Sequence, residues 1–138
     1  SNYCLEDVKR IAPFYDIAFP ATSYPLKEII YKANSILSEV SADLLKMELD
    51  IYWIMKASDD PFAYFDQYPG RFTMCHVKDM GADGAIVDVG RGTIDFNNIL
   101  ARREQAGIEH YFVEMDNPTD SLETIRYSYE SAKKIQIG

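Results

Sequence analysis

The sequence lacks three features that would each point to a particular class of protein. It has two cysteines, Cys4 and Cys75, in 138 residues, so no framework of disulfide bonds is predicted. Its 14 basic residues are outnumbered by 22 acidic ones, and a net charge of −8 argues against binding a phosphate backbone, which needs clustered positive charge. No apolar run approaches the roughly 18 residues of a membrane-spanning helix. Neither nucleic acid nor membrane is therefore an expected partner.

The composition that is present is that of an ordinary globular protein. Hydrophobic residues make up 47% of the chain and charged residues 26%, which predicts one domain over residues 1–138 with a sizeable core. No signal peptide is visible. The chain begins with Ser1 and Asn2 rather than Met, as a processed or tag-scarred product does. We expect a soluble protein, either cytoplasmic or exported after removal of a signal.

The hydrophobic pattern predicts an α/β protein in which strands alternate with helices. A helical segment is expected over residues 1–40 and βα units over 41–138. The predicted strands are Leu44–Asp50, Phe72–Val77 and His110–Met115. The predicted helices are Leu5–Tyr15, Pro25–Val40, Pro61–Tyr68, one capped by Thr93 or Asp95 and stopped by Gly107, and Ser121–Ile135. Residues 51–57 fit either loop or helix, and the Gly-rich stretch 78–92 is expected to be a functional or mobile loop.

Titratable residues stand near the C-terminal end of each predicted strand. If the strands are parallel, their alternation places Asp50, His76 and Glu114 on one face at one rim. Carboxylate oxygens with an imidazole nitrogen suit Mn²⁺, Mg²⁺, Zn²⁺ or Co²⁺. The alternative is that strand ends are polar because they meet water, which would make His76 a structural residue.

Other residues near these strands have simpler interpretations. Lys78 and Asp79 could form only a surface ion pair. Glu48 lies within a strand and needs a partner if it is buried; Lys46, on the same face, is the candidate, and the alternative is that Glu48 is simply exposed. Cys75, in the middle of a strand, is expected to be a small buried residue.

Four motifs in fixed order carry a resemblance to a known family. They are ELDIYW (48–53), HVKDM (76–80), GRGTIDF (90–96) and FVEMDN (112–117). Residues 41–135 resemble the C-terminal half of the sugar phosphate isomerase/epimerase group, within the xylose-isomerase-like TIM barrel superfamily. The resemblance implies a partial (β/α)8 barrel of three or so parallel strands, and an isomerase of carbohydrate metabolism that acts on a sugar or sugar phosphate.

The resemblance also implies roles for particular residues. Asp50, His76 and Glu114 match three of the family's four metal ligands, and the family's first Glu has no match. Glu114 would also move a proton, with Lys78 assisting catalysis. Trp53 and Asp79 would contact substrate. Trp53 stands where epimerases of the group carry a second His, so their substrate contacts are not transferable.

The chain is much shorter than a full barrel of about 250 residues. Two interpretations remain: a fragment of a longer protein, or a short relative that completes its sheet by association, as a homo-oligomer. The metal would bind weakly or be absent, because one carboxylate is missing. Alternatives to catalysis are a non-catalytic half-barrel, and a carbohydrate-binding or assembly module favoured by Trp53 and the ten Tyr residues.

Overall fold

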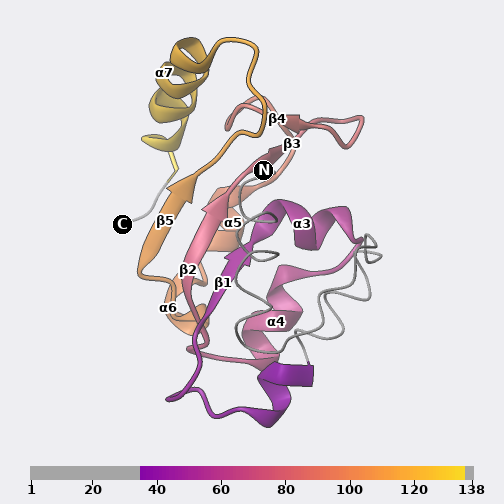
Figure 1. Ribbon diagram of the computed structural model, residues 1–138, viewed down its shortest axis with the longest axis vertical. Coiled ribbons are helices and arrows are strands. Elements are labelled where there is room, and N and C mark those ends of the chain that lie inside the picture. The colour runs from indigo at the N-terminus through magenta and orange to yellow at the C-terminus, as the bar shows by residue number, and fades with distance from the viewer. Residues whose placement is uncertain (1–34, 136–138) are drawn as a thin grey trace, which may run out of the picture.

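A computed structural model describes residues 35–135, whose centre is a parallel sheet of three strands in the order β1-β2-β5. The strands are β1 (Met47–Asp50), β2 (Phe72–Val77) and β5 (His110–Val113), and all point the same way (Figure 1). The prediction of parallel strands alternating with helices is therefore confirmed. β1 begins three residues later than predicted, and β5 ends two residues earlier. Most of the helical segment predicted over residues 1–40 lies outside the described residues. The part of it that the structure describes is helical over residues 35–39.

Four of the five described helices that follow β1 begin at an aspartate, and the exception is α6 (Arg103–Ala106). The other four are α3 (Ile51–Lys56), α4 (Pro61–Gln67), α5 (Phe96–Leu100) and α7 (Ser121–Ala132). The carboxylates of Asp50, Asp60, Asp95 and Asp120 accept hydrogen bonds from backbone N–H groups at the starts of α3, α4, α5 and α7. Of residues 51–57, left open by the sequence, 51–56 are helical and Ala57 is the C-cap. The single helix predicted before Gly107 is two short ones, and Gly107 ends the second with a left-handed φ of 87°.

The two faces of the sheet have different environments. One carries Leu49, Cys75 and Val77, which are buried in a core with residues of the helices such as Phe65 and Leu100. This confirms the expected burial of Cys75, and burial is the main reason that the pKa of its thiol rises to about 12. The opposite face carries Glu48, Asp50 and His76, whose side chains lie close to one another.

Two elements differ from the prediction. Residues 78–92 are not a plain loop, because β3 (Asp79–Met80) pairs antiparallel with β4 (Ile86–Val87). Strands of two residues leave no periodicity to detect. The helix predicted over Ser121–Ile135 is present as α7, but two apolar residues at helical spacing in it, Leu122 and Ile125, are 75% and 65% exposed. α7 lies beyond the β5 edge of the sheet (Figure 1). No helix in residues 35–135 has the length and apolarity needed to cross a membrane.

Candidate metal centre

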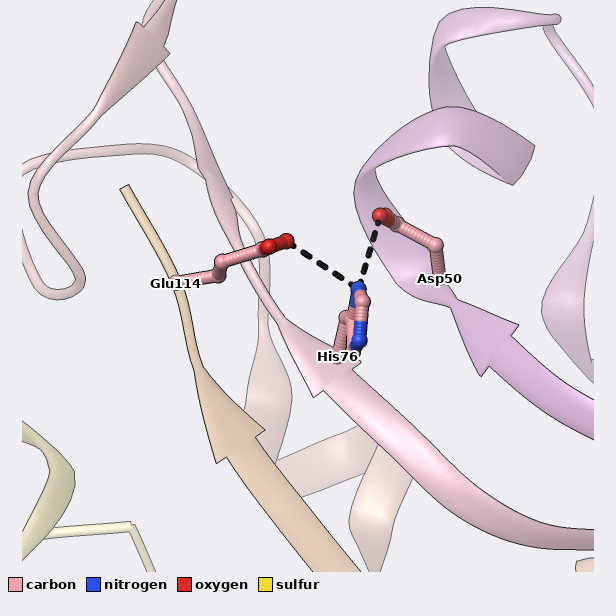
Figure 2. Close-up of side chains that lie close together, drawn as sticks. All are labelled: Asp50, His76 and Glu114. Carbon is pink, nitrogen blue, oxygen red and sulfur yellow. Dashed lines mark ion pairs between the residues drawn. The ribbon is translucent and has the colours of Figure 1, made fainter. Parts of the chain in front are cut away.

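The C-terminal ends of the three strands bring Asp50, His76 and Glu114 together. Asp50 is the last residue of β1 and lies beside His76 of β2. Glu114 directly follows β5, and its backbone N–H donates to the carbonyl of Val77, which keeps it in line with the sheet. Since alternate side chains of a strand share a face, all three point to the same side (Figure 2). The predicted convergence at one rim is confirmed.

The distances within this triad are short. His76 Nδ1 lies 3.0 Å from Glu114 Oε2 and 3.4 Å from Asp50 Oδ2. One ligand atom from each residue can be chosen so that all lie within 4.8 Å of one another. The second oxygen of Asp50, Oδ1, accepts the Trp53 N–H at 3.1 Å, so the start of α3 fixes the orientation of this carboxylate. The triad is therefore positioned by backbone contacts as well as by mutual attraction.

The arrangement fits a divalent cation. Ligands bonded to one ion at about 2.0–2.2 Å lie roughly 3 to 3.5 Å apart, and the two distances from His76 Nδ1 to the carboxylates, 3.0 and 3.4 Å, have that spacing. Glu114 Oε2 is shielded from solvent and lies 3.0 Å from His76 Nδ1 and 2.7 Å from Lys78 Nζ. Lys78 already supplies positive charge to this oxygen, so a metal ion would share it with the ammonium group. Two carboxylates and one imidazole form a mixed donor set that does not by itself select one metal.

Lys78 is a buried cation at the centre of the acidic groups. Its Nζ lies 2.7 Å from Glu114 Oε2, 3.4 Å from Asp50 Oδ2 and 3.3 Å from Asp116 Oδ2, and the residue is 3% exposed. The interpretation as a surface ion pair with Asp79 is therefore wrong. Burial alone would lower the pKa of Lys78, but the hydrogen bond to Glu114 and the surrounding negative charges outweigh it, and the pKa is raised.

Asp79 is buried, and its carboxylate is hydrogen-bonded to the backbone. It is 1% exposed, and its carboxylate accepts hydrogen bonds from the backbone N–H groups of Met80, Gly90, Gly92 and Ile94. A Cβ at Gly92 would lie 2.1 Å from Asp79 Oδ1, so only glycine allows this approach. The substrate contact expected for Asp79 does not fit this placement, because its acceptor oxygens are already used by the backbone.

Trp53, the other residue expected to contact substrate, lies next to the cluster. It is 39% exposed, and Lys78 Nζ stands 5.9 Å from the centre of its ring. Its ring meets Tyr52 edge to face, with centroids 4.9 Å apart. Trp53 therefore offers a supported apolar surface beside the triad.

Glu48 is a member of the site that the sequence interpretation did not assign. Its Oε1 lies 2.8 Å from His76 Nε2. Of the two interpretations of Glu48, exposure is confirmed, since its side chain is 41% exposed. The pairing with Lys46 is wrong, because Lys46 Nζ donates instead to the carbonyl of Gly70 at 2.8 Å. Glu48 stands two residues before Asp50, so the sequence indicates that the two side chains share a face. The sequence does not indicate that the partner of Glu48 is His76 of β2.

Comparison with known proteins supports this description of the chain. Two crystal structures of sugar phosphate isomerase/epimerases from Parabacteroides distasonis are similar to it. The first is 29% identical with a TM-score of 0.60 and covers 78% of this chain. The second is 23% identical with a TM-score of 0.62, covers 76% of this chain, and shows the fold alone. No family model and no curated protein matches the chain.

The chain spans 36% of the length of each of these two structures. That share is consistent with the C-terminal half of such a protein and with a partial TIM-barrel-like fold. The resemblance to sugar phosphate isomerase/epimerases noted in the sequence is thus confirmed.

Proposed function

We propose that this chain carries the metal-binding and proton-transfer part of a sugar phosphate isomerase/epimerase. The observation that carries the proposal is the convergence of Asp50, His76 and Glu114 at the C-terminal rim of parallel strands, with ligand atoms within 4.8 Å. In (β/α)8 barrels this rim is where catalytic residues stand. The similarity to two sugar phosphate isomerase/epimerase structures supports a sugar or sugar phosphate as the substrate.

Glu114, Lys78 and Trp53 have different roles in the proposed reaction. A divalent metal, when bound, would polarise a substrate carbonyl and the neighbouring hydroxyl. Glu114, whose Oε2 faces the cluster, takes the proton from the adjacent carbon through its carboxylate. The buried ammonium of Lys78 stabilises negative charge that develops on the substrate oxygen. Trp53 provides an apolar wall for one face of the sugar.

Proton exchange in D₂O tests this function directly. We expect the chain with Mn²⁺ to exchange the carbon-bound proton of a ketose or aldose phosphate slowly, because this step needs only the metal, the carbonyl and a base. Glu114→Gln should reduce the rate by at least about 100-fold, the usual contribution of a general base. Deuterium incorporation is measured by NMR of the sugar phosphate.

The control is Glu109→Gln, the same loss of charge at an exposed position just before β5, at the other end of that strand. It should exchange at the wild-type rate. If Glu114→Gln exchanged as fast as wild type, Glu114 would not be the base. If metal bound and no exchange occurred in any variant, the non-catalytic half-barrel would be the better description.

We also predict that the chain self-associates. Both β1 and β5 are edge strands of the described sheet, and a cavity of about 470 Å³ between β5 and α7 is bordered by the exposed Val113, Ile125 and Tyr129. Open edges and uncovered apolar surface favour association. Sedimentation velocity at micromolar concentration should therefore show a dimer or larger species.

A charge placed on the exposed α7 stripe should weaken this association without affecting the fold. Ile125→Glu is expected to shift the species toward monomer, because it buries a carboxylate in the contact. The charge-matched control Asn98→Glu, at an exposed position of α5, should sediment as wild type does. A wild-type monomer that unfolds cooperatively would argue against the prediction.

A further inference from the structure

The imidazole of His76 has a carboxylate on both of its nitrogens. Nε2 faces Glu48 Oε1 at 2.8 Å, and Nδ1 faces Glu114 Oε2 at 3.0 Å and Asp50 Oδ2 at 3.4 Å. A neutral imidazole has one N–H and one lone pair, and an ionised carboxylate can only accept a hydrogen bond. The two sides therefore compete for a single proton, and the outcome decides which nitrogen can bind a metal.

We propose that Glu48 is a positioning residue that holds the proton of His76 on Nε2. The lone pair of Nδ1 is then directed at the place between Asp50 and Glu114 where a cation fits. The inference rests on the proposed metal site, but it concerns residues of this chain and can be tested without metal. Carboxylates that fix the tautomer and orientation of a metal-binding histidine in this way also raise its basicity.

The geometry of the sheet explains why Glu48 can take this position. Glu48 precedes Asp50 by two residues, so both project from the same face of β1, separated along the strand by roughly 7 Å. His76 lies opposite Asp50 in the neighbouring strand, and its ring extends between the two acids, with one nitrogen toward each. Lys46, the cation nearest to Glu48 in sequence, donates to the carbonyl of Gly70 instead.

The simpler interpretation is that Glu48 forms only a half-exposed ion pair, since its side chain is 41% exposed and such pairs contribute little to stability. The two interpretations differ in one observable. An ion pair that matters only for stability does not decide which nitrogen of the neutral ring carries the proton, whereas a positioning residue does. The tautomer of His76 is therefore the measurement of choice.

The chain makes this measurement simple, because it has only two histidines, His76 and His110. Long-range ¹H–¹⁵N correlation spectra of metal-free protein across a pH series identify the tautomer of the neutral ring, and His76→Ala assigns the signals. We expect the Nε2–H form in wild type. Glu48→Gln should keep it, because an amide oxygen still accepts the hydrogen bond. Glu48→Ala should shift the population toward Nδ1–H, where Asp50 and Glu114 provide acceptors.

Zn²⁺ affinity gives a second readout, and Zn²⁺ is chosen because it binds such sites more strongly than Mn²⁺. Glu48→Ala should weaken binding by about 10 to 100-fold and Glu48→Gln by less. Glu109→Gln should match wild type in both readouts, and circular dichroism should show that every variant is folded.

An unchanged His76 tautomer in Glu48→Ala would overturn the inference, whatever the metal result. If the tautomer shifts as expected but wild type binds no Zn²⁺, the positioning role stands and the proposed metal function fails. The two failures are thus distinguishable.

Discussion

Asp79→Asn is expected to destabilise the fold by about 3 to 4 kcal/mol, a large fraction of the stability of a domain of this size. Asp79 Oδ2 accepts from the N–H groups of Gly90 and Gly92, both at 2.9 Å, and Oδ1 accepts from Met80 and Ile94. An amide has only one oxygen. Its NH₂ group would face two backbone donors in a site that is 1% exposed, leaving both donors without an acceptor.

Urea unfolding followed by circular dichroism measures the effect. The matched control is Asp83→Asn in the same segment, where an exposed carboxylate accepts a single hydrogen bond from Ala85 N–H through Oδ1. Asparagine can keep that bond, so the control should change stability by less than about 0.5 kcal/mol. Equal small losses in both variants would show that the four hydrogen bonds of Asp79 do not hold the segment 78–92 in place.

The sequence predicted the triad because the information needed is local. Strand parity is read directly from the chain, and parallel βα units align the strand ends, so Asp50, His76 and Glu114 could be placed together without knowing any side-chain contact. Of the two caps predicted for the helix before Gly107, Thr93 and Asp95, the structure has Asp95; a cap is predictable because it acts on backbone N–H groups two or three residues ahead.

The features that were missed depend on contacts between segments far apart in the chain. In the sequence, Lys78 and Asp79 have the pattern of a surface ion pair. Their actual partners are distant in the chain: Lys78 contacts Glu114 and Asp116, and Asp79 accepts hydrogen bonds from the backbone of residues 90–94. Leu122 and Ile125 of α7 have the spacing of a buried helix face, but this spacing does not indicate which segment, if any, packs on them. Within residues 35–135 no element buries Leu122 or Ile125.

The metal itself provides the second large effect. We expect Mn²⁺ to bind the wild-type chain with a dissociation constant of about 10⁻⁴ M or weaker, and His76→Ala to show no measurable binding heat by calorimetry. Two features of the site make the wild-type affinity low. Residues 35–135 bring together three ligands, and a further charged carboxylate would contribute much of the attraction for a hard ion. The ammonium of Lys78 also stands 2.7 Å from Glu114 Oε2 and already neutralises part of the charge that would attract the metal.

His76→Ala should have a large effect in spite of that low affinity, because within residues 35–135 the triad is then reduced to two carboxylates beside a buried ammonium. Repulsion between Lys78 and a divalent ion a few ångströms away amounts to several kcal/mol at the effective dielectric of a protein surface. Loss of the imidazole ligand leaves less attraction to oppose this repulsion. The control is His110→Ala, the other histidine, which is exposed at the beginning of β5 and should leave the heats unchanged. Identical heats for wild type and His76→Ala would mean that Mn²⁺ binds acidic groups elsewhere on a chain of net charge −8, and the triad would then lose its assignment as a metal centre.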